Sequence, residues 1–261
     1  MAENLKHKKA FRAGILRSFS QSAGINSETM QGLGYGFAMI PLLKELYAGD
    51  ELRDAVVRES AFFNTYPGSV GYIYGITAKY EEQHAADPTQ ASEQMINQLK
   101  VSLMGPLAGL GDSLMMAVFR MIVTVIAVDF ALSKNLIGPV FFLFVFHALY
   151  LFLRIKGAYV GYKEGPLYLQ QFMDNGTVER LTRLLGMIKA AMIGYLVYRA
   201  IQIPIPDSWH FIDETLGQVL PHWLALIVVC LGVILYKKNL GQKYVVLLVA
   251  VVSLIVTLFL I

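Results

Sequence analysis

The chain has 261 residues, of which 56% are hydrophobic and 16% are charged, and its mean hydropathy is +0.51. Soluble domains carry about one-quarter charged residues, so this composition favours a membrane protein. The formal net charge of +3 is small and spread along the chain, which argues against nucleic acid as a partner. The single cysteine, Cys230, excludes an intrachain disulfide and paired-cysteine metal sites.

The chain begins with a basic, amphipathic segment that contains Lys6, Lys8, Lys9 and Arg12. This segment lacks the uninterrupted apolar core and the small-residue cleavage site of a secretory signal. We therefore expect it to stay in the mature protein.

Two apolar stretches follow, residues 31–47 and 61–78, and each is interrupted by glycines and by one proline, Pro41 or Pro67. Broken helices at membrane depth are tolerated where protein or a water-filled cavity satisfies the freed backbone groups. The pattern predicts re-entrant helical hairpins that enter the membrane from the cytoplasm. The alternative is a cytosolic helical lobe with glycine-rich turns.

The second stretch contains an amide and a hydroxyl directly before a proline, at Asn64 and Thr65. These groups can bind the hydroxyls of a sugar, and the neighbouring aromatic Tyr66 can stack on the apolar face of a sugar ring. The alternative is an Asn-Thr turn beneath two core phenylalanines, because these residue types are ordinary turn formers.

Residues 80–98 are rich in carboxylates, among them Glu81 and Glu82, and we expect a solvated cytoplasmic connector there. Further on, Asp112 precedes Arg120 by eight positions, or about two helical turns, which places both on one side of a helix. An arginine within a membrane needs a partner, either Asp112 or a carboxylate of another subunit. These four residues are candidates for a polar pathway or an interface, and a helix cap by Asp112 is the alternative.

Glycines recur every four residues at three places, and this spacing favours tight helix packing. The three sets are Gly32 with Gly36, Gly105 with Gly109, and Gly157 with Gly161 and Gly165.

Five stretches approach the length of about 20 residues that crosses a bilayer as a helix. They are residues 114–132, 136–153, 184–203, 219–236 and 244–261. The sequence thus predicts an all-α integral membrane protein, with re-entrant hairpins in residues 1–113 and about five transmembrane helices in residues 114–261.

Lysine and arginine gather in short cytoplasmic loops, which fixes the predicted orientation. The link after the second span holds Arg154, Lys156 and Lys163, whereas residues 204–218 hold acidic residues without lysine or arginine. This distribution predicts a cytoplasmic N-terminus and a periplasmic C-terminus.

The five histidines are too scattered for a metal-ligand pattern, and residues 32–36 lack the full glycine spacing of a nucleotide-binding loop. We therefore expect no cofactor, no metal and no covalent chemistry on this chain.

Several motifs together resemble the IID subunit of mannose-family phosphotransferase-system permeases. They are Met-Gln-Gly-Leu-Gly (30–34), Phe-Phe-Asn-Thr-Tyr-Pro (62–67), Leu-Met-Gly-Pro-Leu-Ala-Gly-Leu-Gly-Asp (103–112) and Gly-Tyr-Lys-Glu-Gly (161–165). The resemblance implies a multi-pass protein of the bacterial inner membrane that pairs with an EIIC subunit, in a higher oligomer of that pair. It also implies cytoplasmic EIIA and EIIB proteins, which carry the phosphoryl group, and a sugar that is phosphorylated as it enters.

Within the resemblance, Asn64 and Thr65 are the implied contributors to the sugar site. Tyr66 and Ser113 depart from the family pattern, which has Gln or His at the first position and Pro at the second. The identity of the sugar therefore stays open among mannose, a hexosamine, an N-acetylated sugar and another hexose derivative. The alternatives to this family are a self-contained transporter or channel, which would show an inverted repeat, and a membrane enzyme, which would need a convergent catalytic set.

Overall fold

The computed structural model describes residues 6–201, and the regular structure within that range is helical. The elements are α1 (Lys8–Ser18), η1 (Gln21–Gly24), α2 (Gly32–Leu46), α3 (Gly49–Glu59), α4 (Val70–Ala86), α5 (Glu93–Gly111), η2 (Asp112–Phe119), α6 (Arg120–Leu132), α7 (Ile137–Glu164), α8 (Leu167–Asp174) and α9 (Thr177–Ile201). The chain divides into two compact units, Met1–Met192 and Ile193–Ile261, and helices α1 to α8 belong to the first. The predicted spans 219–236 and 244–261 lie outside the described residues.

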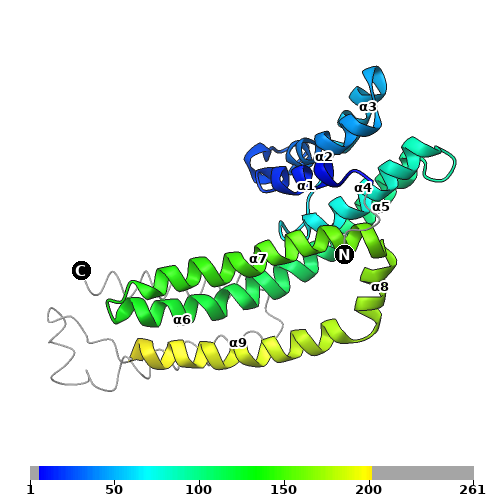
Figure 1. The fold of residues 1–261 in the computed structure, drawn as a ribbon. Coiled ribbons are helices and arrows are strands. Elements are labelled where there is room, and N and C mark those ends of the chain that lie inside the picture. The colour runs from blue at the N-terminus through cyan, green and yellow to red at the C-terminus, as the bar shows by residue number, and fades with distance from the viewer. Residues whose placement is uncertain (1–5, 202–261) are drawn as a thin grey trace, which may run out of the picture. The chain divides into compact units, whose positions relative to one another are not determined.

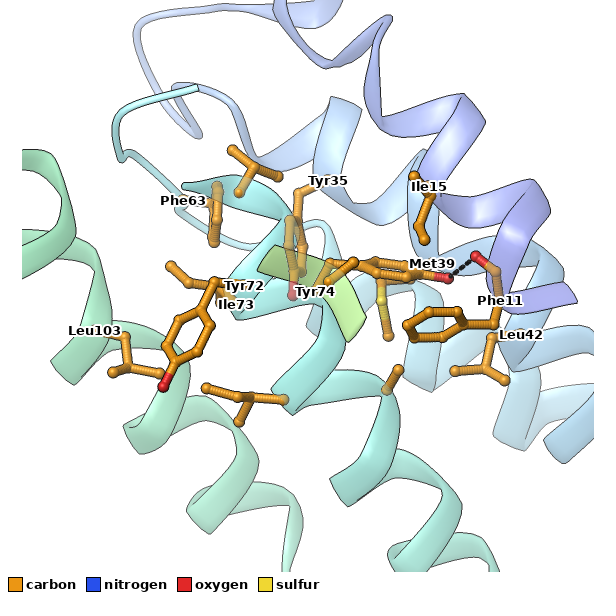
Figure 2. Close-up of a cluster of buried hydrophobic side chains, with 14 of the residues drawn as sticks. Phe11, Ile15, Tyr35, Met39, Leu42, Phe63, Tyr72, Ile73, Tyr74 and Leu103 are labelled. Atoms are coloured by element: carbon orange, nitrogen blue, oxygen red, sulfur yellow. Dashed lines mark hydrogen bonds between the residues drawn. The ribbon is translucent and has the colours of Figure 1, made fainter. Parts of the chain in front are cut away.

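Aromatic side chains from α1, α2 and α4 form the centre of a buried hydrophobic cluster (Figure 2). Tyr35 stacks on Phe63, with ring centroids 4.1 Å apart and ring planes 19° from parallel. The Tyr74 hydroxyl donates a hydrogen bond of 3.1 Å to the carbonyl of Phe11, so a buried polar group joins α1 to α4. These contacts give the N-terminal helices a packed core of their own.

Glycines let α4 and α7 approach so closely that backbone meets backbone. A Cβ atom at Gly71 would lie 1.9 Å from the carbonyl oxygen of Arg154, and one at Gly161 would lie 2.1 Å from that of Tyr72. No side chain fits at such distances, so this face of α7 requires glycine. The tight packing expected for Gly157 and Gly161 is thus present, whereas Gly105 and Gly109 have an open Cβ position in the described part of the chain.

Two helices of the described residues are long and apolar enough to cross a membrane: Glu93–Leu132, of 40 residues, and Ile137–Glu164, of 28. Only 28% and 11% of the residues in their most apolar windows are buried, unlike core helices of soluble proteins. The last part of the first helix, α6, runs beside the second helix, α7 (Figure 1). Predicted spans 114–132 and 136–153 fall within these helices, and α9 makes residues 184–201 of the third helical.

The first long helix is continuous through residue 113, the predicted boundary between the hairpin region and the transmembrane region. It passes from α5 into the π-helical segment η2 and on into α6. Asp112 therefore lies inside a helix, and the alternative interpretation of it as a cap at a helix start is wrong.

The expectation of a loop around Arg154 is wrong, because this residue lies in the second long helix. Helix α7 continues to Glu164, so Arg154, Lys156 and Lys163 lie within the helix. Arginine has a high helix propensity, and the Arg154 guanidinium reaches polar groups of the α1–η1 corner, which satisfy it without water.

We predict that Gly71→Ala destabilises the protein by about 2 kcal/mol or more, because the new methyl group meets a backbone carbonyl that cannot move aside. Thermal unfolding of the purified chain in detergent measures the effect. Gly105→Ala is the matched control, since its Cβ position is open and alanine favours the helix by up to about 1 kcal/mol. Equal stability of the two variants would contradict the proposed backbone contact.

Candidate functional site

The loop between α3 and α4 carries the predicted site residues, and its backbone is fixed on one side by the segment that directly precedes α2. The Phe63 amide donates to the carbonyl of Thr29 at 3.1 Å, and the Gln31 amide donates to the carbonyl of Phe63 at 2.8 Å. Phe63 is fully buried in the core, whereas the next residue, Asn64, is exposed. With Phe63 held in the core by these two backbone hydrogen bonds, the Asn64 side chain lies at the surface.

Thr65 fastens the other side of the loop. Its hydroxyl donates to the carbonyl of Met104 in α5 at 3.1 Å, and its side chain is buried. The Gln31 side chain pairs with both backbone groups of Thr65, donating to the carbonyl at 3.0 Å and accepting from the amide at 3.3 Å. The loop is thus held at the residue that follows Asn64, by Gln31, which directly precedes α2, and by Met104 of α5.

Tyr66 points into the protein. Its ring lies against Gly111, where a Cβ atom would come within 2.1 Å of the ring, and it meets the Tyr150 ring edge-on. The Tyr66 hydroxyl is buried and has no hydrogen-bond partner among the described residues. Because Gly111 directly precedes Asp112, this contact brings the loop next to Asp112.

Glu81 is fully buried, so the expectation of a solvated connector is wrong at this residue. Arg58 of α3 pairs with the Glu81 carboxylate at 2.9 Å, and the Tyr47 hydroxyl donates to it at 2.7 Å. Arg58 also pairs with Glu93 at the start of α5 at 2.6 Å. Glu81 is one of a set of ionic contacts that join α3, α4 and α5.

A second ion pair, between Glu59 of α3 and Lys100 of α5, is buried beside the first. The Lys100 ammonium lies 3.3 Å from the carboxylate and donates to the carbonyl of Arg58 at 3.1 Å, and both side chains are fully buried. Burial raises the pKa of the Glu59 carboxyl to about 7; Glu81 adds to the shift, and Lys100 opposes it. One Glu59 oxygen has no partner among the described residues.

The other polar candidates have different surroundings. Glu82 accepts a short hydrogen bond from the Tyr162 hydroxyl of α7. Asp112 and Arg120 are exposed, and no ion pair joins them within the described range. The structure thus brings Asn64, Thr65, Tyr66 and Asp112 into one region, while Glu81 and Glu82 make contacts between helices.

Sequence reasoning missed three buried residues of this region: Gln21, Gln31 and Arg154. Arg154 directly follows an apolar run and is followed by Lys156 and Lys163, so the sequence assigns it to a basic cytoplasmic loop. The two glutamines lie in short polar segments whose burial depends on contacts with distant residues. Among the described residues, no group of three or more His, Cys, Asp or Glu side chains could hold a metal.

The regular structure of residues 6–201 is helical and includes two helices that are long and apolar enough to cross a membrane, which is the class of structure expected of a helical membrane protein. Over residues 5–261 the chain matches the family model described as the PTS system mannose/fructose/sorbose family IID component. The chain belongs to this family and is a non-catalytic EIID membrane component of a mannose-family phosphotransferase-system permease. The resemblance drawn from the motifs is confirmed.

Characterised relatives agree in length as well as in sequence. The chain is 32% identical over 244 residues to the sorbose-specific EIID component of Klebsiella pneumoniae, covering 88% of each chain. It is 32% identical over 209 residues to the mannose-specific EIID component of Escherichia coli K12, covering 79% of this chain and 73% of that one. It is also similar to a chain of the mannose transporter ManYZ in complex with microcin E492, with a TM-score of 0.59, 28% identity and coverage of 95% and 94%.

We predict that Lys100→Met destabilises the protein by about 3 kcal/mol, because it leaves the buried Glu59 carboxylate without its cation. The double variant Glu59→Gln/Lys100→Met should lose less stability than the two single losses added together, since neither charge is then left alone. Chemical unfolding in detergent gives the four values. Simple additivity would show that the two side chains do not interact.

We also predict that the stability of the protein falls as pH rises from about 4.5 to about 7. The pKa of Glu59 is about 7 in the folded protein against an ordinary value of 4.5, so the folded state binds the extra proton in this interval and loses the advantage above it. Unfolding at about pH 5 and about pH 8 should show a smaller difference for Glu59→Gln than for the unaltered chain. An unchanged difference would assign the pH dependence to other groups.

Proposed function

We propose that this chain forms the sugar pathway of its permease together with an EIIC subunit, and that the Asn64 amide contributes to the sugar site. One observation carries the second part: Asn64 is exposed, while both neighbouring residues are buried and hydrogen-bonded to α5 or to the segment directly before α2. A fixed amide offers a donor and an acceptor to sugar hydroxyls without a large ordering cost. Thr65 and Tyr66 then support the site from within the protein.

The chemistry of the permease takes place on other subunits in this proposal. EIIA and EIIB carry the phosphoryl group, and EIIB transfers it to the sugar as the sugar arrives in the cytoplasm. The substrate in this proposal is a hexose, a hexosamine or an N-acetylated sugar, and relatives named for sorbose, fructose and mannose support a hexose.

The pairing with EIIC is supported by a helix face that has no neighbour within the described chain. Val101 is 60% exposed on α5, and Gly105 and Gly109 have open Cβ positions near it. A helix of a membrane partner can approach closely along such small residues. We place the assembly in the bacterial inner membrane as a higher oligomer of the EIIC–EIID pair.

The proposed topology follows the sequence. Residues 1–113 contain re-entrant hairpins that enter from the cytoplasm, and residues 114–261 contain about five spans, with the N-terminus cytoplasmic and the C-terminus periplasmic. The two long apolar helices support the membrane part of this scheme. Asp112 and Arg120, exposed on that long helix, are then available to the pathway or to the partner subunit.

We predict that Asn64→Ala lowers the kcat/KM for sugar uptake at least about tenfold, because a hydrogen-bonding pair to the substrate is lost. The assay is phosphoenolpyruvate-dependent uptake of radiolabelled mannose, fructose, sorbose and glucosamine by vesicles that hold the chain with EIIC, EIIA and EIIB. Gln98→Ala, which removes another exposed amide from the neighbouring helix α5, is the matched control. Unchanged uptake by an assembled Asn64→Ala complex would remove Asn64 from the sugar site.

A further inference from the structure

A continuous series of buried hydrogen bonds runs from α7 to the Asn64 loop. The Arg154 guanidinium donates to the Gln21 side-chain oxygen at 2.8 Å, and the Gln21 amide donates to the Gln31 side-chain oxygen at 3.0 Å. The Gln31 amide then donates to the Thr65 carbonyl at 3.0 Å. All four residues are at most 7% exposed, so water does not compete for these bonds.

Arg154 is a buried cation that neutral groups satisfy. Besides Gln21, its guanidinium donates to the hydroxyl and carbonyl of Ser18 and to the Tyr150 hydroxyl, and it lies 5.3 Å from the centre of the Phe19 ring. Within residues 6–192, no carboxylate pairs with it. Hydrogen bonds from a charged donor are about twice as strong as neutral ones, so Arg154 strongly fixes the acceptors that it holds.

The hydrogen bonds of this series can donate in only one direction, from Arg154 towards Thr65. The Thr65 amide must donate, so Gln31 turns its oxygen to that amide and its NH₂ group to the Thr65 carbonyl. The same Gln31 oxygen then accepts from Gln21, whose own oxygen is left for a donor. Arg154, which has donors only, fits this end and no acceptor-only side chain would.

We propose that Gln21, Gln31 and Arg154 are positioning residues, which set the orientation of the Asn64–Thr65 backbone and so the direction of the Asn64 amide. The inference rests on the proposed role of Asn64 in the sugar site. Both backbone groups of Thr65, the residue bonded directly to Asn64, are held by Gln31. A small rotation of this peptide moves the Asn64 side chain, and a misplacement of about 1 Å is enough to weaken binding severely.

The loop has other anchors, which separates positioning from folding. Phe63 forms backbone hydrogen bonds with Thr29 and Gln31, and the Thr65 hydroxyl donates a hydrogen bond to the carbonyl of Met104. Loss of the side-chain series should therefore leave the loop folded and change its geometry.

The test uses Gln31→Met and Gln21→Met, which keep the side-chain length and remove the hydrogen bonds. In vesicles with EIIC, EIIA and EIIB, we expect each variant to raise KM about tenfold for the sugar that the unaltered complex takes up from the panel of mannose, fructose, sorbose and glucosamine. Maximal uptake should stay within about twofold, because the phosphoryl-transfer subunits are unaffected. The double variant should resemble either single variant, since one break interrupts the whole series.

Thr77→Val is the matched control, because it removes a different buried hydrogen bond, the 2.9 Å contact with the Tyr35 hydroxyl, that does not reach Thr65. Arg154→Lys should keep KM closer to that of the unaltered chain than Arg154→Met does, since lysine retains a charged donor. An equal rise in KM for Thr77→Val would overturn the proposal, as would a failure of both glutamine variants to assemble, because the series would then be structural.

The result for Asn64→Ala separates this inference from the proposed function. If Asn64→Ala abolishes uptake while both glutamine variants keep the original KM, the positioning role is wrong and the sugar-site role stands. If Asn64→Ala leaves uptake unchanged, the proposed site itself is wrong.

Discussion

The backbone contact between α4 and α7 determines how the rest of the described unit is arranged. Gly71 and Gly161 remove the side chains that would separate the two helices, so the α7 backbone lies directly on α4. Once α7 lies there, Arg154 reaches the α1–η1 corner and Tyr162 reaches Glu82. A helix long and apolar enough to cross a membrane thus obtains fixed polar contacts with the N-terminal helices through residues in its C-terminal half.

Buried charged side chains of the described unit have two kinds of surroundings, with different consequences for stability and geometry. Glu59 with Lys100 and Glu81 with Arg58 are ion pairs that join α3, α4 and α5, where the loss of either partner leaves a costly buried charge. Arg154 instead faces neutral acceptors. A cation without a counter-charge orders several dipoles around itself, which suits a residue that must orient a corner and a loop rather than only hold two helices together.

Local patterns in the sequence predicted some features well because those features depend on local chemistry. Nearly all of the apolar runs 114–132 and 136–153 falls inside long helices, and Asn64 and Thr65 lie in a non-helical loop before Pro67. The surroundings of Glu81 and Arg154 could not be predicted in this way, since their partners lie 23 and 133 positions away in the sequence, at Arg58 and Gln21. Both residues looked solvated because charge near a basic or acidic stretch usually is.

The two interpretations of the Asn-Thr motif, a sugar-binding segment and a turn over core phenylalanines, describe different atoms of the same loop. Phe63 is fully buried in the aromatic core and Phe62 is 55% exposed, so one of the two phenylalanines packs as the structural interpretation expects, whereas Asn64 is exposed. An amide that binds a sugar benefits from a loop held in this way. The core fixes the loop backbone before the ligand arrives, so less conformational freedom is lost on binding. The same core that stabilises the N-terminal helices therefore also prepares the proposed site.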